Sequence, residues 1–185
     1  NAGLTTIGGF DALSSVTAVD IEGNPALTTL DAFSALTTAD ALALTGNAVL
    51  VDLGGLDSLA VLGELTLTDN DSLETVSGLP ALKSLTTAEL EGNASLADLS
   101  WLGGVSGLER LSLVDNAALV DLGSLTNLTL GDLIVWQSAI AELTLSEDLL
   151  LSSLLLWDNP SLVRIDVSSQ PGLTGLSLEE HPGLE

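Results

Sequence analysis

The feature that most constrains the fold is an asparagine that recurs every 23 residues without an insertion. Aligned on this asparagine, the chain reads NAGLTTI at residue 1, NPALTTL at 24, NAVLVDL at 47, NDSLETV at 70, NASLADL at 93 and NAALVDL at 116. Repeats of roughly 20–50 residues are typical of solenoids, in which each repeat forms one turn that stacks on the next. The repeat therefore predicts a stacked coil.

The apolar positions inside each repeat indicate strands rather than helices. In the second repeat they are Leu27, Leu30, Phe33, Leu36, Ala39, Leu42 and Leu44. These positions step by threes and twos and form no stripe with the helical period of about 3.6 residues. The last two positions alternate with period two, which predicts a short strand with one buried face just before the next asparagine.

After Asn116 the interval shortens to 22, 21 and 22 residues, at Ser138, Asn159 and His181. Beyond residue 143 a half-period of eleven appears, in LTLSEDLLLSS, LLLWDNPSLVR and IDVSSQPGLTG. Two such halves predict a turn with a strand on each of two faces. We expect one right-handed β-rich solenoid of about eight turns over 1–185, regular in 1–137 and built of tighter two-strand turns in 138–185. We also expect it to be a segment of a longer protein.

The pattern LxLxxNxxLxxL at this spacing resembles the leucine-rich repeat. The stretch IEGNPALTTLDAFSALTTADALALTGN is most similar to the receptor L-domain type of that repeat. The resemblance covers the whole chain and implies a receptor-like scaffold of the kind found in receptor ectodomains and in many bacterial surface proteins. Two departures are that the family's cysteine-rich capping modules are absent and that the last half-turns look like a plain two-strand β-helix.

The recurring asparagine is predicted to be structural. An inward Asn can donate to and accept from backbone groups of its own and adjacent turns, which would otherwise be buried without partners. We call this column the asparagine ladder; its members are Asn24, Asn47, Asn70, Asn93, Asn116 and Asn159, with Ser138 and His181 as substitutes. Gly or Asp precedes most of these asparagines, which predicts a turn with positive φ.

The charge of the chain disfavours two classes of partner. Its net charge is −23, from 26 acidic residues and three basic ones. Nucleic acids and anionic membranes are bound through clusters of Lys and Arg, so neither is expected to bind. The longest apolar stretch, residues 149–157, is about half the length that spans a bilayer, so no membrane insertion is expected. An extracellular setting with salt or calcium would relieve the self-repulsion.

The polar residues show no arrangement that indicates catalysis. Ser, His and Asp are not placed at nucleophile spacing, and no glycine-rich phosphate loop follows a strand. His181 shares its repeat position with Asn159 and is predicted to be a turn residue. We therefore expect no enzyme, no catalytic residue, no metal site and no resident cofactor. The stacked pair Asp98 and Asp121 leaves surface calcium open, with solvated repulsion as the default.

The outward positions of the predicted strands change character near the C-terminus. The residue two before the ladder position runs Glu22, Thr45, Thr68, Glu91, Val114, Trp136, Trp157 and Glu179. Two residues earlier the column runs Asp20, Ala43, Thr66, Glu89, Ser112, Ile134, Leu155 and Ser177. Both columns become apolar over the same turns, which predicts a binding surface of Val114, Ile134, Trp136, Leu155 and Trp157. The alternative is that this strand tilts, or is covered, and the tryptophans join the core. Trp101, on the opposite arc, is expected to project outward.

The function expected from these features is non-enzymatic recognition or adhesion outside the cell or at a cell surface. The partner would be a protein, including a second copy of the chain, or secondarily a carbohydrate. The main alternative is a structural subunit that polymerises end to end into a filament. Ice binding ranks lower, because the threonine pairs at 5–6 and 28–29 give way to Val51 and Asp52. A polysaccharide lyase ranks last, since it needs cations that the chain lacks.

Overall fold

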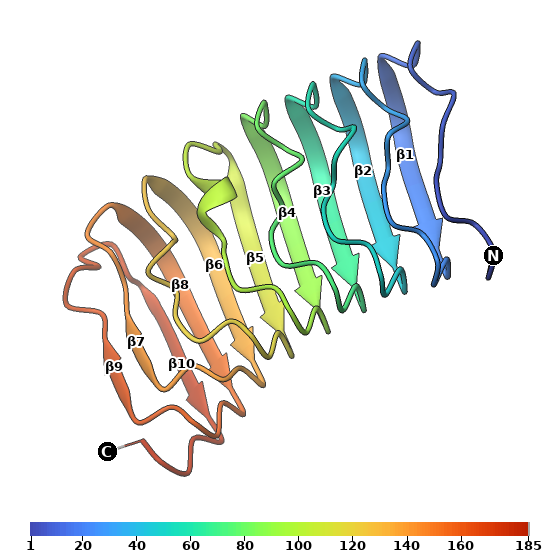
Figure 1. Cartoon of the computed structure of the whole chain (residues 1–185). Coiled ribbons are helices and arrows are strands. Elements are labelled where there is room, and N and C mark those ends of the chain that lie inside the picture. The colour runs from blue at the N-terminus through green and yellow to red at the C-terminus, as the bar shows by residue number, and fades with distance from the viewer. Residues whose placement is uncertain (185) are drawn as a thin grey trace.

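Parallel strands stacked side by side form one continuous wall of the coil (Figure 1). The computed structural model describes residues 1–184. Eight strands make the main sheet, in the order β1-β2-β3-β4-β5-β6-β8-β10, and each pairs in parallel with its neighbour. Their bounds are β1 (Ser15–Glu22), β2 (Thr38–Thr45), β3 (Val61–Thr68), β4 (Ser84–Glu91), β5 (Leu108–Val114), β6 (Leu128–Trp136), β8 (Leu149–Trp157) and β10 (Gly175–Glu179). The predicted β-rich solenoid is confirmed.

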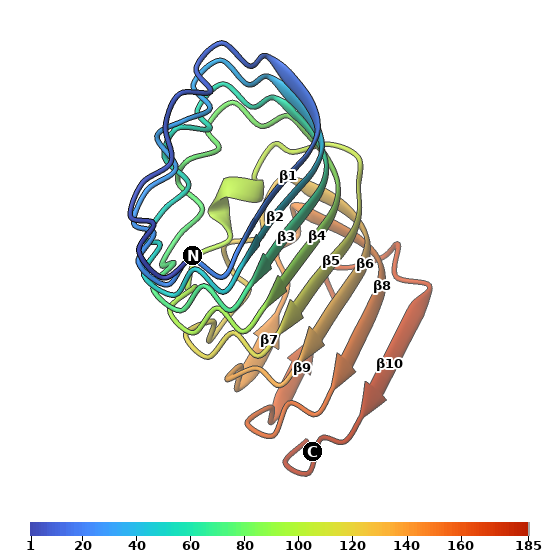
Figure 2. The same cartoon turned by 90° about the vertical axis from the view of Figure 1, so that its right-hand side faces the viewer.

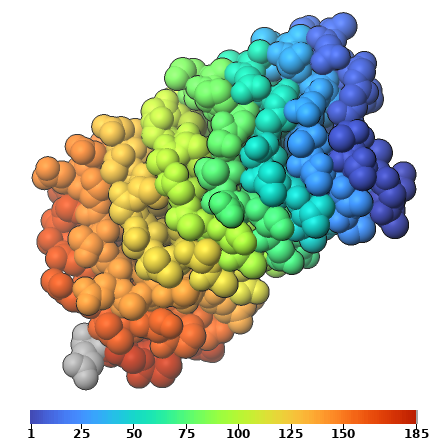
Figure 3. Space-filling view, viewed as in Figure 1, coloured from blue at the N-terminus to red at the C-terminus, as the bar shows by residue number. Residues whose placement is uncertain are grey.

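The coil is right-handed and makes about seven turns, slightly fewer than the eight expected. Viewed from its N-terminal end, the strands run downward on the right and the connecting arcs return on the left as the coil recedes (Figure 2). Residues 1–14 form the first arc, which pairs with the next turn through a bridge between Thr6 and Thr29. The space-filling view shows successive turns as adjacent bands (Figure 3).

The C-terminal turns carry a second, small sheet. It consists of β7 (Glu142–Thr144) and β9 (Arg164–Asp166), which pair in parallel. These strands alternate along the chain with β8 and β10, so the half-period of eleven corresponds to strands on two faces of the coil. Over the earlier turns the second face is an irregular arc, apart from the short 3₁₀ helix η1 (Ser100–Leu102). Within residues 1–184 no helix is long and apolar enough to cross a membrane.

Each strand of the main sheet is longer than the predicted apolar pair. β2, for example, begins at Thr38, and its inward residues Ala39 and Leu42 are three positions apart. One residue between them, Asp40, is skipped in the pairing with both neighbouring strands. The facing residues Thr17 and Gly63 are skipped as well, so the pairing is interrupted on all three strands without a change of register. Asp40 and Ala41, which lie between the two inward residues, both face outward. The interruption recurs at the same place between β6 and β8.

The asparagine ladder supplies the polar contacts inside each turn. Asn93 donates from Nδ2 to the carbonyl oxygens of Leu67 at 2.8 Å and Glu91 at 3.1 Å. Its Oδ1 accepts the backbone N–H of Asn70 at 3.1 Å. One side chain thus links two consecutive turns. All the predicted members are buried: Asn24, Asn47, Asn70, Asn93, Asn116 and Asn159.

The ladder substitutes bind in the same way. Ser138 donates its hydroxyl to Oδ1 of Asn159 at 2.7 Å. Nδ1 of His181 accepts the backbone N–H of Asn159 at 3.4 Å, while Nε2 lies 3.1 Å from the Leu156 carbonyl oxygen. This pattern fits a neutral ring protonated at Nε2. His181 is therefore a turn residue, as its repeat position predicted.

The residue before each ladder position has a left-handed backbone. φ is positive at Gly23, Gly46, Asp69, Gly92, Asp115 and Asp158, as predicted, and also at Gln137 and Glu180. Glycine and asparagine-like residues reach this conformation at low cost, which explains why Gly and Asp dominate the column.

We predict that Asn93→Ala lowers the free energy of unfolding by about 2–5 kcal/mol, because it leaves buried backbone groups of neighbouring turns without partners. Urea denaturation measures the effect. Asn127→Gly is the control: Asn127 is exposed and has a φ of 54°, which glycine tolerates, so its removal should cost less than about 1 kcal/mol. Equal losses in the two variants would show that the ladder contacts are not stabilising.

Candidate binding surface

The parallel register brings the five predicted surface residues together on the outer face of the main sheet. Val114 pairs with Trp136, and Trp136 pairs with Trp157. Ile134 pairs with Leu155 one step earlier on the same strands. Residues two apart on a strand share a face, so the two rows are contiguous. We call Val114, Ile134, Trp136, Leu155 and Trp157 the apolar strip.

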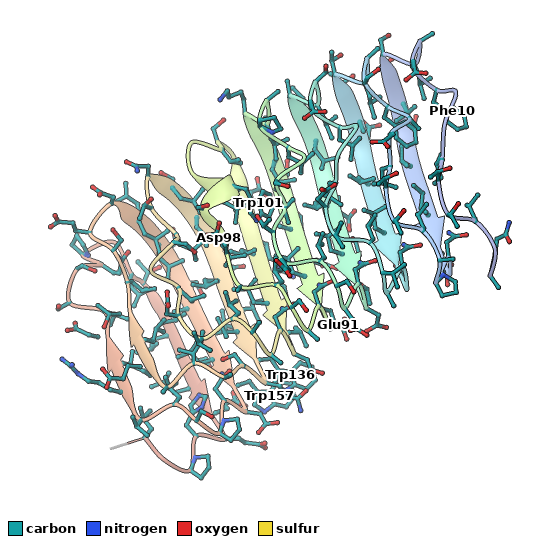
Figure 4. The ribbon with its side chains drawn as sticks, viewed as in Figure 1. Phe10, Glu91, Asp98, Trp101, Trp136 and Trp157 are labelled. Atoms are coloured by element: carbon teal, nitrogen blue, oxygen red, sulfur yellow. The ribbon has the colours of Figure 1, made fainter. Side chains whose placement is uncertain are left out.

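The two indoles stack on each other. Their ring centroids are 4.7 Å apart and their planes differ by 9°. This distance matches the spacing of about 4.8 Å between paired strands, so identical residues in register stack face to face. Figure 4 shows the two rings side by side at the ends of β6 and β8. Trp157 covers one face of the Trp136 ring. Val114, on the preceding strand β5, lies on the other side of the ring.

The strip is exposed to different degrees along its length. Trp157 is 45% exposed and Leu155 36% exposed, whereas Val114, Ile134 and Trp136 are half-buried. The alternative in which the tryptophans join the core therefore does not hold. Nε1 of Trp136 is buried and makes no hydrogen bond. The strip thus presents mainly hydrocarbon to the solvent.

Carboxylates border the strip on both sides along the coil. Glu91 precedes Val114 in one row, and Glu179 follows Trp157 in the same row. In the second row Glu89 lies two turns before Ile134, separated from it by Ser112. All three glutamates are exposed. An apolar centre with an acidic border is the result.

A polar hollow opens on the same face of the sheet beside the strip. It has a volume of about 430 Å³, and its lining residues come from β3, β4, β5 and β6: Glu64, Thr87, Glu89, Glu109, Arg110 and Asp132. We call it the acidic hollow. Arg110 forms an ion pair with Asp132, with 3.7 Å between Nη2 and Oδ2. Glu109 and Arg110 both face outward because they lie between the inward residues Leu108 and Leu111, which are three positions apart.

The acidic pair singled out in the sequence, Asp98 and Asp121, has a local role. Asp98 accepts the backbone N–H of Ser100 at 2.9 Å, and Asp121 accepts that of Gly123 at 2.9 Å. Each carboxylate thus closes its own turn, as Asx turns do. In the part of the chain that the structure describes, no cluster of three or more His, Asp or Glu side chains is placed to hold a metal ion.

A shifted pKa occurs away from the strip, at Asp166 in β9. Hydrogen bonds from the hydroxyl and backbone N–H of Ser168 lower the pKa of this carboxyl, and Arg164 at 3.7 Å adds to the effect. The group belongs to the second sheet rather than to the main sheet that carries the strip.

The prediction for Trp101 was wrong. Its side chain packs partly against the core, and its Nε1 is buried without a hydrogen bond. The equivalent position in an earlier turn, Ala32, is fully buried, so this position points inward. An indole is much larger than the alanine at that position, and Trp101 lies within the short helix η1 (Figure 4).

Comparison with known proteins gives no relative. No family model, curated protein or solved structure matches the chain.

We predict that Trp136→Leu and Trp157→Leu are energetically coupled, because each removes the stacked partner of the other. A double-mutant cycle measured by urea denaturation should give a coupling energy of about 0.5–1.5 kcal/mol. Trp101→Phe combined with Trp157→Leu is the control and should be additive, since Trp101 has no stacked partner among the aromatic pairs of the described chain. A coupling energy near zero between Trp136 and Trp157 would contradict the stacked geometry.

Proposed function

We propose that this chain is a non-enzymatic recognition module that binds a protein partner through the apolar strip. The proposal includes a location outside the cell or at its surface and an adhesion-like role, in keeping with the leucine-rich-repeat resemblance. The observation that carries it is the exposure of Trp157 and Leu155 on the outer face, beside half-buried Trp136. Large side chains at inward positions pack in the core. Trp157 and Leu155 point outward and take no part in that packing.

The strip is large enough to support binding. The side chain of one tryptophan has a surface of about 150–250 Å². Exposed apolar patches of a few hundred Å² are often functional. At about 25 cal/mol per Å², burying roughly 200 Å² of apolar surface contributes about 5 kcal/mol before the costs of association. Aromatic residues of this kind are frequent binding hot spots.

The indole geometry favours protein over carbohydrate. A sugar ring stacks on an open aromatic face, but the stack covers one face of each indole. The other face of Trp136 lies toward Val114, and that of Trp157 lies toward the Glu179 strand. The pair therefore offers ring edges to the solvent, together with Leu155 and Ile134. Edges and aliphatic groups suit the apolar side chains of a protein.

The threonines do not favour ice binding. Thr28 donates its hydroxyl to the Thr5 carbonyl oxygen at 3.2 Å, and Thr37 donates to that of Ser14 at 3.0 Å. Their hydroxyl groups thus serve the stacking of turns. Catalysis is not favoured either, because the chain has only three basic residues to stabilise the negative charge that develops in such reactions.

End-to-end assembly is the second candidate. An apolar hollow of about 580 Å³ lies at the N-terminal end, lined in part by Ile7, Phe10 and Leu13. At the other end, inward-facing Leu176 and Leu178 of β10 are exposed. A second copy would cover both surfaces. We prefer recognition through the strip, because each copy carries a net charge of −23 and copies repel each other.

The strip is tested by placing a charge on it and, separately, elsewhere on the same strand. Leu155→Glu lies in the strip, and Leu150→Glu is a matched control on β8, where Leu150 is also outward and 56% exposed. Peptides selected from a random display library against the unmodified protein serve as probes. We predict that Leu155→Glu weakens their binding at least about tenfold, since an unpaired charge would be buried, while Leu150→Glu changes it less than about twofold. Equal effects of the two variants would contradict the proposal.

A further inference from the structure

We infer that the apolar strip and the acidic hollow bind one partner segment together: an apolar side chain of the partner lies on the strip, and a Lys or Arg of the same segment enters the hollow. This inference rests on the proposed function and specifies the chemistry of the partner. Its two parts are independent features of the outer face, one apolar and one anionic.

The two features are close enough for one segment to reach both. Asp132 lines the hollow and lies two residues before Ile134 of the strip on β6, with both side chains on the outer face. Residues two apart on a strand are about 7 Å apart. Glu89 and Leu155 mark the wider span, three turns or about 14 Å. An extended partner chain covers these distances with two to four residues, at about 3.3 Å each.

The hollow has an excess of negative charge. Its lining contains the four carboxylates of Glu64, Glu89, Glu109 and Asp132 against the one guanidinium of Arg110. Arg110 is already paired with Asp132, so it does not neutralise the other three. Carboxylates that face one space repel each other, and an incoming cation relieves that repulsion. The hollow is therefore suited to a positively charged group.

The cation that fits is a side chain rather than a metal ion. Four carboxylates on β3, β4, β5 and β6 are spread over successive turns about 4.8 Å apart. No three acidic groups of residues 1–184 are placed to coordinate one ion. A guanidinium or ammonium group carries several donors and can bind separate carboxylates at once. A volume of about 430 Å³ accommodates such a group with part of its stem.

A second copy of the chain is a poor source of that cation. The chain has three basic residues and a net charge of −23. Arg110 lies in the hollow itself, and Arg164 pairs with Glu142 at 3.9 Å and Asp166 at 3.7 Å. Lys83 is the one basic side chain left, and the net charge of −23 on each copy opposes its approach. A different protein, with a basic residue close to an exposed aromatic or aliphatic one, is therefore the better fit.

The test uses synthetic peptides of defined charge. The probe is a Gly/Ser peptide that carries Phe and Arg two positions apart; its two partners replace Arg by citrulline, or Phe by Ser. Citrulline keeps the shape of arginine and removes its charge. We expect the Phe/Arg peptide to bind at least about tenfold more tightly than either partner, with an affinity that falls as salt is added.

Charge-matched variants separate the hollow from the overall charge of the protein. Glu89→Gln/Glu109→Gln removes two charges from the hollow, and Glu74→Gln/Glu147→Gln removes two exposed charges outside the hollow and the strip. We expect the first pair to weaken the Phe/Arg peptide about tenfold and the second less than about twofold. Equal effects of the two pairs would overturn the inference, because attraction would then come from the net charge alone.

The same peptide distinguishes failure of the inference from failure of the proposed function. If Leu155→Glu abolishes binding and the hollow variants leave it unchanged, the strip is a binding surface and the inference is overturned. If neither Leu155→Glu nor the hollow variants change binding, both are overturned. Loss of binding with both sets of variants, and with the citrulline peptide, supports both.

Discussion

Every turn of this coil depends on the hydrogen bonds of the asparagine ladder. A tight inward turn buries backbone N–H and C=O groups that find no hydrogen-bond partner in the adjoining strand. Each ladder side chain satisfies groups of adjacent turns, as Asn93 does for Leu67, Glu91 and Asn70. Because the contacts are made between consecutive turns, they also fix the register: a strand that slipped by one residue would lose its ladder contact and expose its inward leucines.

The fixed register determines which side chains are neighbours on the outer face. Residues of one column lie one above another, so a substitution that recurs in adjacent turns creates a continuous surface. Trp136 on Trp157 is the clearest case, with the indoles 4.7 Å apart. The columns are polar or acidic over most other turns, which keeps the remaining surface solvated. Recognition is therefore proposed where this polar pattern is interrupted.

The sequence was sufficient to predict the solenoid, the ladder and the five residues of the strip, because all of them follow from a strict repeat. It was not sufficient for features that break the repeat. The outward orientation predicted for Trp101 was wrong, because the repeat position points inward and the arc adapts to the indole. The acidic hollow was missed because the types of the outward residues between two inward positions, such as Glu109 and Arg110, vary from turn to turn. The three-residue step between inward Leu108 and Leu111 was the available signal.

The most direct test of the in-register coil uses the absence of cysteine from the chain. Thr45 and Thr68 are register partners, about 4.8 Å apart, which a disulfide can bridge. Thr66 is displaced by two residues and lies roughly 8 Å from Thr45, beyond that reach. The account predicts that Thr45→Cys/Thr68→Cys forms an intramolecular disulfide on mild oxidation and that Thr45→Cys/Thr66→Cys does not. Preferential bridging of the second pair, or of neither, would contradict the stacking on which the proposed surface depends.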